Sequence, residues 1–333
     1  MSYKRKFASL LIRLRLLNAY SFLRHLLLRS QAAILIYHRV GNSIEHSWSN
    51  TSIGVEDFEY QIRYLYSKCN VMPLDEMLLH LQAKKTLPPK TVAITFDDGY
   101  KDNYTNAYPI LRKYSLPAII FLTTCHIDTG ELIWSDKVKY AIMNTGRERV
   151  ELKGLGMYSL HSHDDRKQAY FDIVSKLKEF LQDEKNLMIK KLLTKLAVSI
   201  PNDLGKEVGL SWDEIREMSN NGITFGAHTV THAILTKLPL EETRKEILES
   251  KKRIEEEVGM PVTTFSYPNG GPADFNNEIK SILKQNGFMY AVTASPPKLV
   301  TPDTDLWELG RISMGLNIQT CMYFPDYIQS QIL

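Results

Sequence analysis

Hydrophobic and polar positions along the chain follow two periods, which indicate strands and helices in regular succession. Short β-branched or apolar runs match buried strands, and apolar positions spaced three and four residues apart match helices. Strands are predicted at 32–37, near Val71, and at 91–96, 117–122, 223–227, 263–266 and 289–293. Helices are predicted at 55–67, 75–83, through 110–111, and at 211–220, 241–258 and 274–286. This α/β alternation predicts a parallel sheet that closes into a barrel of about seven strands.

The first thirty residues depart from this rhythm, because they combine leucines at helical spacing with basic residues only. Arg13 and Arg15 interrupt the apolar run, which argues against a secretory signal and against a bilayer span of ~20 apolar residues. We interpret residues 1–30 as a basic helix whose residues 3–30 lie on an anionic membrane surface. The alternative is a helix packed on the protein's own body.

Residues 131–208 also interrupt the alternation, since they lack convincing strands and contain a charged, helical stretch from Arg166 to Val198. We interpret them as a helical insertion in a barrel domain that spans residues 31–333. Such an insertion is a candidate lid or substrate wall over the barrel mouth.

The net charge indicates the class of partner only when the basic N-terminal segment is counted separately. The net charge is +3, and removing seven of the 41 Lys and Arg, those within residues 1–30, leaves 34 basic against 38 acidic residues. A slightly acidic body argues against a nucleic-acid partner. The three cysteines, Cys69, Cys125 and Cys321, are far apart and odd in number, which fits a reducing compartment better than a disulfide framework.

The first candidate site residues follow the strand at 91–96, which ends in Asp97, Asp98 and Gly99. Neighbouring carboxylates repel each other, so either water solvates them on a turn or a cation holds them. Active sites of parallel barrels collect at the carboxyl ends of the strands, which is where this pair falls.

A second candidate element follows the strand at 223–227. His228 and His232 are spaced i and i+4, and they can converge on one metal if the loop turns helically. Together with the aspartate pair they make a set of one carboxylate and two imidazoles. Such a set suits Zn²⁺, with Fe²⁺, Co²⁺ or Ni²⁺ as alternatives.

These two motifs resemble those of a known family. Thr95-Phe96-Asp97-Asp98-Gly99 followed by His228-x-x-x-His232 is similar to the polysaccharide deacetylases with a NodB-homology domain, carbohydrate esterase family 4. The resemblance covers about residues 32–315. It implies a distorted (β/α)7 barrel, with Asp97 as general base and Asp98, His228 and His232 as metal ligands.

The chain departs from the family at its third motif, usually Arg-x-Pro-Tyr, where it has Ser266-Tyr267-Pro268-Asn269. The backbone N–H of Asn269 is still a candidate oxyanion donor. The arginine that would orient the base is missing at this position. Arg311 is the candidate substitute, and a surface arginine is the alternative interpretation.

The family's late Leu-x-His motif, which supplies the general acid, is also absent, because no histidine follows His232. His38 ends the first strand in Tyr37-His38-Arg39-Val40, an opening similar to that of exopolysaccharide-type members. We therefore expect His38 to be the general acid, with a structural role as the alternative.

Aromatic and remaining histidine residues give weaker signals. Trp134, Trp212 and Trp307 are candidates to line a sugar groove, because aromatic faces stack on pyranose rings, with core packing as the alternative. His126 is expected to border the cleft, and His161 and His163 to be solvated in the insertion.

The functional hypothesis is metal-dependent hydrolysis of N-acetyl groups on amino sugars of a cell-surface or lipid-linked glycan. We expect the enzyme in the cytoplasm, at the inner face of the membrane. The alternatives are an O-acetyl esterase or a deformylase acting on a lipid-linked sugar, and a catalytically inactive carbohydrate-binding homologue.

Overall fold

The structure is a computed structural model that describes residues 31–41, 48 and 51–314. The predicted basic helix over residues 1–30 lies outside the described residues. No helix within the described part of the chain is both long and apolar enough to cross a bilayer.

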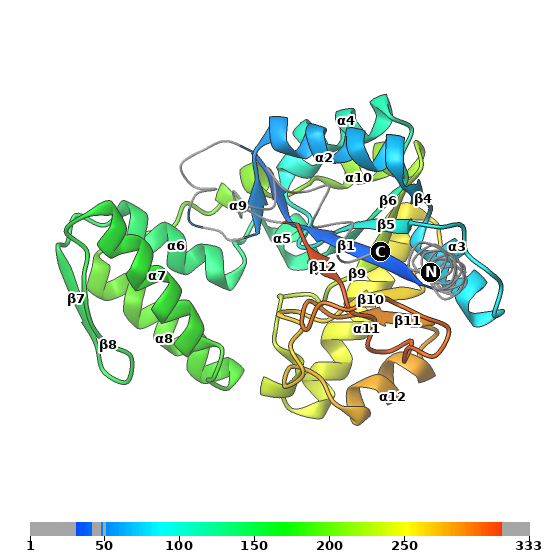
Figure 1. Ribbon diagram of the computed structural model, residues 1–333. Helices are drawn as coiled ribbons and strands as arrows, with labels where there is room; N and C mark the ends of the chain where they lie inside the picture. The colour runs from blue at the N-terminus through cyan, green and yellow to red at the C-terminus, as the bar shows by residue number, and fades with distance from the viewer. Residues whose placement is uncertain (1–30, 42–47, 49–50, 315–333) are drawn as a thin grey trace, which may run out of the picture.

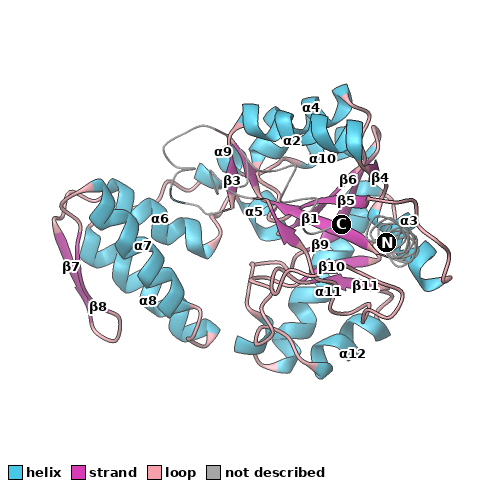
Figure 2. Ribbon diagram, in the orientation of Figure 1, coloured by secondary structure: helices cyan, strands magenta, loops and turns pink. Residues whose placement is uncertain are grey.

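A parallel sheet forms the centre of the molecule (Figure 2). Its strand order is β11-β10-β9-β6-β5-β1-β12, and the short β4 pairs with β5 outside this path. The strands are β1 (Ala32–Tyr37), β4 (Asn70–Val71), β5 (Thr91–Phe96), β6 (Ala118–Leu122), β9 (Ile223–Ala227), β10 (Thr264–Ser266), β11 (Tyr290–Val292) and β12 (Ile312–Ser313). Every residue of β1, β5 and β6 is buried, as expected for strands covered on both faces.

The segment 309–313 closes the sheet into a barrel. Ile312 pairs with Leu35 of β1 on one side, and Leu309 forms a parallel bridge to Val292 of β11 on the other. The predicted (β/α)7 barrel is therefore confirmed. The sequence pattern did not predict β12, because two residues are too short a run to show a period.

Helices surround the sheet (Figures 1 and 2). Ser211 and Glu214 form the expected capping box at the start of α10. α12 begins later than predicted, because Asn276 caps it through the N–H of Ile279. The helices around the barrel are α2 (Val55–Lys68), α3 (Leu74–Gln82), α4 (Tyr108–Lys113), α5 (Thr124–Thr129), α9 (Leu204–Val208), α10 (Trp212–Ser219), α11 (Leu240–Val258) and α12 (Asn277–Gln285), with the π-helix η2 (Asn103–Ala107) before α4 and the 3₁₀-helix η3 (Leu235–Lys237) before α11.

A helical subdomain stands beside the barrel (Figure 1). It consists of α6 (Trp134–Asn144), α7 (His163–Leu177), α8 (Gln182–Leu196) and the antiparallel hairpin β7 (Arg149–Leu152) and β8 (Gly156–Ser159). Its own core includes Ile142, Ile173 and Leu192, all at most 1% exposed. The hairpin was not predicted, because β7 has only two buried residues between exposed charged ones and β8 has none. A second short pair, β2 (Arg39–Val40) with β3 (Ser52–Ile53), lies beyond the end of β1.

Candidate active site

Two aspartates occupy the turn at the carboxyl end of β5. Asp97 and Asp98 are 3% and 7% exposed, so water does not solvate them as it would on an open turn. Asp98 has φ +76° and is followed by Gly99 at φ +79°. A left-handed backbone at a non-glycine residue is strained, and such strain is concentrated at functional sites. The turn directs both carboxylates to the barrel mouth.

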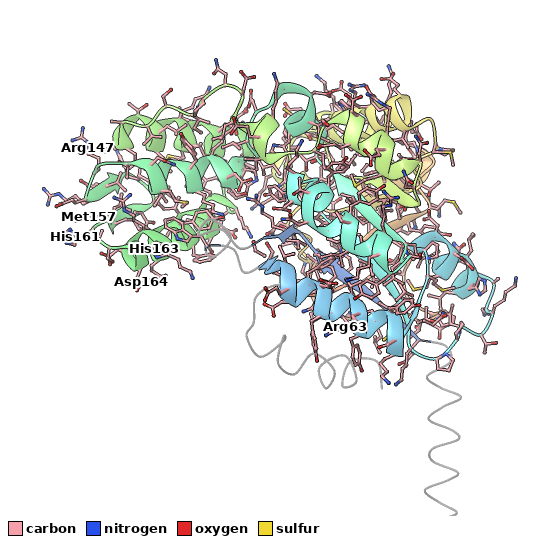
Figure 3. All side chains as sticks on the ribbon, turned by 90° about the horizontal axis from the view of Figure 1, so that it is seen from above. Arg63, Arg147, Met157, His161, His163 and Asp164 are labelled. Atoms are coloured by element: carbon pink, nitrogen blue, oxygen red, sulfur yellow. The ribbon has the colours of Figure 1, made fainter. Side chains whose placement is uncertain are left out.

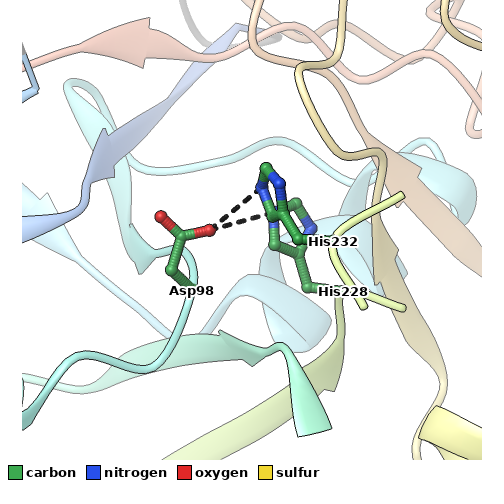
Figure 4. A group of neighbouring side chains, drawn as sticks. All are labelled: Asp98, His228 and His232. Carbon is green, nitrogen blue, oxygen red and sulfur yellow. Dashed lines mark ion pairs between the residues drawn. The ribbon is translucent and has the colours of Figure 1, made fainter. Parts of the chain in front are cut away.

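His228 and His232 follow β9 and face Asp98 (Figure 4). The Nε2 atoms of His228 and His232 lie 3.4 and 3.2 Å from Asp98 Oδ1. The two rings meet edge to face with centroids 4.8 Å apart. Thr229 and His232 have φ +67° and +57°, which turns the loop so that both rings point to one place.

The donor atoms at this place fit a cation. The Nδ1–H of His228 donates to the carbonyl oxygen of Ser266 over 2.7 Å, which leaves the Nε2 lone pair facing Asp98. Asp98 Oδ1 is buried and makes no hydrogen bond of good geometry. In the described part of the chain, Asp98, His228 and His232 form the one such group of three, with ligand-capable atoms all within 4.8 Å of one another. Electron-rich atoms this close repel each other unless a proton or metal ion lies between them.

Charge also keeps Asp98 ionised. Burial raises the pKa of Asp98, but the neighbouring His232 and His228 outweigh that effect and hold the pKa well below its usual range. An ionised carboxylate with two imidazoles is a ligand set that zinc and related divalent ions accept.

Arg311 forms a bidentate ion pair with Asp97. Its Nη1 and Nη2 atoms each lie 2.7 Å from one carboxylate oxygen of Asp97, and Arg311 is fully buried. Its Nε donates to the carbonyl of Thr293 over 3.0 Å, which fixes the direction of the guanidinium. Arg311 is therefore not a surface residue, and that alternative interpretation is wrong.

Two hydroxyl groups form hydrogen bonds to this ion pair. Ser266 Oγ donates to Asp97 Oδ2 over 3.1 Å and accepts from Arg311 Nη2 over 2.9 Å. Thr95 Oγ1 accepts from Arg311 Nη1 over 3.2 Å. Burial raises the pKa of Asp97, but the charges of Arg311 and His228 lower it further, so the pKa lies below its usual range. Asp97 is therefore an ionised, oriented carboxylate beside Asp98.

His38 lies at the end of β1, near the same carboxylates. The side chain of Asn103 donates to the backbone carbonyl of His38 over 2.7 Å, and the buried Nδ1 of His38 has no hydrogen-bond partner. Burial lowers the pKa of His38 more than the nearby charges of Asp98 and Asp97 raise it. The imidazole is therefore neutral at neutral pH.

Asn269 occupies the turn after β10 and has φ +64°. Its Nδ2 donates to Asp274 Oδ2 over 2.6 Å, and the N–H of Gly271 donates to the same oxygen over 2.7 Å. The Asn269 side chain is thus engaged in holding the turn. No described contact joins it to Asp97 or Asp98.

Two further residues were not predicted as parts of the site. Ser266 was noted only as the replacement for an arginine, yet its hydroxyl bonds both members of the ion pair and its carbonyl orients His228. Glu246 of α11 accepts hydrogen bonds from the N–H groups of Val230 and Thr231 over 2.8 and 2.9 Å. It thereby holds the loop between the two histidines. A glutamate within a charged helix gives no sequence signal for this contact.

The weaker candidates lie in several places. Trp212 donates its Nε1–H to Asp128 over 2.7 Å, and Trp307 packs partly buried against the barrel core. His161 lies at the outer end of the helical subdomain, and His163 begins α7 further in (Figure 3). His163 Nε2 accepts a hydrogen bond from Trp48 over 2.7 Å, so His163 has a structural partner.

Comparison with known proteins gives a family match. A family profile described as polysaccharide deacetylase matches residues 84–291. A putative polysaccharide deacetylase of Bacillus subtilis, YxkH, is 23% identical over 301 residues, which is 89% of this chain and 76% of that protein. A poly-β-1,6-N-acetyl-D-glucosamine N-deacetylase of Staphylococcus aureus is 34% identical over 149 residues, which cover 40% of this chain and about half (49%) of the relative.

Solved structures show the same fold. The Streptococcus pyogenes deacetylase PplD in complex with acetate has a TM-score of 0.61 at 18% identity, covering 91% of this chain and 98% of that one. IcaB from Ammonifex degensii has a TM-score of 0.57 at 18% identity, covering 90% and 97% of the two chains.

Proposed function

The chain belongs to the polysaccharide deacetylase family of amide-bond hydrolases, and we propose that it removes N-acetyl groups from amino sugars of a cell-surface or lipid-linked glycan. The observation that carries this proposal is the bidentate contact between Arg311 and Asp97, directly beside Asp98, His228 and His232. It provides an ionised base next to a cation site, the two groups that metal-assisted amide hydrolysis uses.

We assign Asp98, His228 and His232 as ligands of a divalent metal, with Zn²⁺ first and Co²⁺, Ni²⁺ or Fe²⁺ as alternatives. When bound, such an ion supplies a Lewis acid that acidifies water and polarises an amide carbonyl. The carbonyl of Ser266 and the carboxylate of Glu246 support this assignment, because they orient His228 and the loop that carries both histidines.

Asp97 is the proposed general base. It takes a proton from the water that attacks the carbonyl carbon of the N-acetyl group. Its low pKa keeps it ionised, and Arg311 with Ser266 holds the carboxylate in one orientation. Arg311 is thus a positioning residue for the base. The backbone N–H of Asn269 is the proposed hydrogen-bond donor to the oxyanion that develops.

His38 is the proposed general acid. The carbon–nitrogen bond breaks only when the leaving amine receives a proton. His38 is neutral at rest, so before it donates to the amine it must gain a proton, which we assign to the one that Asp97 removes from the attacking water. The negative charge of Asp98 beside it favours that protonation.

The amino-sugar substrate is inferred from two relationships. The Staphylococcus aureus relative is named for N-deacetylation of poly-β-1,6-N-acetyl-D-glucosamine, and the family is named for polysaccharides. The proposal includes lipid-linked saccharides because the seven Lys and Arg of residues 3–30 suit an anionic membrane surface, where such saccharides are anchored. We accordingly place the protein in the cytoplasm, at the inner face of the membrane.

The test combines metal analysis with acetate release from a panel of lipid-linked and polymeric N-acetylated amino sugars. We expect acetate from at least one of them, and Asp97→Asn should abolish release while metal content stays the same. No acetate from any substrate would contradict the proposal. Parallel assays use the N-formyl and O-acetyl counterparts, and formate release, or acetate only from the O-acetyl esters, would support the deformylase or esterase instead.

The membrane proposal has a separate test. The full chain should cosediment with phosphatidylglycerol vesicles at low salt and dissociate as salt screens the charges. Cosedimentation with phosphatidylcholine vesicles to the same extent, or with neither lipid, would contradict it.

A further inference from the structure

A short π-helix, η2, begins at Asn103, soon after the turn that carries Asp97 and Asp98. Turns of this kind are rare, and they are frequently found at functional sites. The Asn103 side chain is polar but only 1% exposed. The roles proposed for the site residues do not yet account for this buried amide beside the aspartate turn.

The π-helix supplies hydrogen bonds to the backbone that carries His38. The side-chain amide of Asn103 donates to the carbonyl of His38 over 2.7 Å. The side-chain amide of Asn106 donates to the carbonyl of Val40, also over 2.7 Å. Both carbonyls lie beyond the end of β1, so these two amides fix the path of the chain as it leaves the sheet.

Asp102, the residue before the π-helix, holds the same stretch of backbone. Its Oδ1 accepts the N–H of Val40 and the amide of Asn103, each over 3.2 Å, and its Oδ2 accepts the Nε–H of Arg39 over 2.8 Å. The Arg39 guanidinium also lies over the ring of Tyr100, 4.5 Å from its centroid. Asp102 is 7% exposed, and separating such a buried ion pair is costly. Residues 38–40 are therefore held by a charged contact as well as by amides.

These contacts join the proposed acid to the proposed base. The N–H of Asp97 donates to the carbonyl of Tyr37, the residue before His38, over 3.0 Å. One segment, 97–106, thus contains the base, a metal ligand and the groups that hold the backbone at His38. The buried Nδ1 of His38 has no hydrogen-bond partner among the described residues. The direction of its ring therefore depends on the backbone that Asn103 holds.

The amide of Asn103 is suited to this contact in particular. Its nitrogen faces two acceptors, the carbonyl of His38 and the carboxylate of Asp102, so a donor is required there. Its Oδ1 is buried and has no hydrogen-bond partner within the described part of the chain. A buried acceptor without a donor destabilises a fold, so packing alone does not explain an asparagine at this position.

We propose that Asn103 is a positioning residue for His38, holding the imidazole where its proton reaches the leaving amine. Asp102 and Asn106 support the same stretch of backbone. This inference rests on the proposed function, in which His38 is the general acid, and it extends that function to a residue outside the reacting groups. Loss of Asn103 should displace the acid while the metal ligands and the base stay in place.

The test is a double-mutant cycle of Asn103→Ala with His38→Gln. The measured quantity is kcat for acetate release from a β-1,6-linked N-acetylglucosamine tetrasaccharide, together with metal content. Asn103→Ala alone should lower kcat by about tenfold to a hundredfold, because small displacements of a catalytic group have effects of this size. In the His38→Gln protein it should lower kcat by less than about twofold, since the group that it positions is already absent. Metal content should be the same in all four proteins.

Asn286→Ala is the matched control. It also removes an amide that donates to a backbone carbonyl, that of Ile282, over 2.7 Å. Asn286 lies between α12 and β11, where the chain enters the sheet at the edge opposite the site. This variant should turn over as wild type does.

Equal losses from Asn103→Ala in both backgrounds would show a general effect on the fold and overturn the positioning role. Unchanged turnover in Asn103→Ala would overturn it as well. Because Asn103 is buried, the half-buried Asn106 provides a second variant, Asn106→Ala, for which the same dependence on His38 is expected with a smaller loss. Equal losses from Asn106→Ala in both backgrounds would also contradict the inference.

Amide hydrogen exchange tests the backbone contact without turnover. Exchange at the N–H of Val40 should be severalfold faster in Asn103→Ala than in wild type or Asn286→Ala, and an unchanged rate would overturn the inference. Failure of the positioning role alone leaves acetate release by the wild-type protein intact. Absence of that release, or full turnover in His38→Gln, would instead contradict the proposed function and the positioning role with it.

Discussion

Arg311 and Asp97 form a buried bidentate ion pair although 214 positions separate them in the chain. The pair exists because the segment 309–313 closes the barrel beside β1, which is paired in turn with β5. Ser266 occupies the position where the family usually has its arginine. Its small side chain leaves room for the Arg311 guanidinium, and its hydroxyl bonds both partners.

Arg311→Met should reduce kcat/KM by roughly a hundredfold and move the acidic limb of its pH profile to higher pH. The guanidinium lowers the pKa of Asp97 against the effect of burial, so without it the base is protonated at higher pH. The measurement is kcat/KM against pH, together with metal content. Arg216→Met, which removes an exposed ion pair, is the control. An unshifted acidic limb would contradict the orienting role.

Ser266→Ala should have a smaller effect than loss of the arginine. It removes one hydrogen bond to Asp97, for which a loss of about 1 kcal/mol is typical, or a few-fold in kcat/KM. The Ser266 carbonyl that orients His228 remains, so metal affinity should not change. A large loss of metal with Ser266→Ala would show that the hydroxyl acts through the ligand loop instead.

His38→Gln should abolish most turnover while metal content stays normal, because glutamine cannot deliver a proton to the leaving amine. A loss of about a hundredfold or more in kcat is the range expected for a general acid. His161→Gln, at an exposed histidine of the helical subdomain, is the matched control. Retained turnover in His38→Gln would remove the assignment.

Glu246→Gln should lower metal affinity by roughly tenfold to a hundredfold, the usual effect of losing a contact that orients metal ligands. One carboxylate oxygen accepts the N–H groups of Val230 and Thr231, and the other accepts the Thr231 hydroxyl, whose hydrogen bond an amide nitrogen cannot accept. Competition with a chelator measures the affinity. Glu256→Gln on the exposed face of α11 should behave as wild type. Equal affinities for the two variants would rule out this role.

The free energy of unfolding should increase as pH rises from about 8 to about 10.5, because of the buried Lys185. Burial lowers its pKa from 10.5 to about 8, so across this range the unfolded chain binds more protons than the folded one. Lys185→Met should remove this dependence and raise the free energy of unfolding at pH 7 by on the order of 3 kcal/mol. Denaturant unfolding at pH 7 and pH 9.5 measures both effects, and equal slopes with pH in the two proteins would contradict the prediction.

Local patterns in the sequence were sufficient for the barrel class and for the candidate ligands. Strand and helix periods depend on neighbouring residues, and the motifs around Asp97 and His228 each lie within a few positions of one strand end. Arg311 could be named as a candidate only because the usual arginine was missing at Ser266. His38 was named in the same way, because the usual late histidine motif is absent and His38 follows the first strand.

Tertiary structure decided the rest. The closing strand β12 and the hairpin of β7 and β8 are too short to show a period. The hydroxyl of Ser266 and the carboxylate of Glu246 acquire their roles only when segments far apart in sequence meet. Hydrogen bonds and ion pairs act over about 3 Å in space. Separation along the chain does not reveal which side chains come that close, so only closure of the barrel could show that Arg311 lies against Asp97.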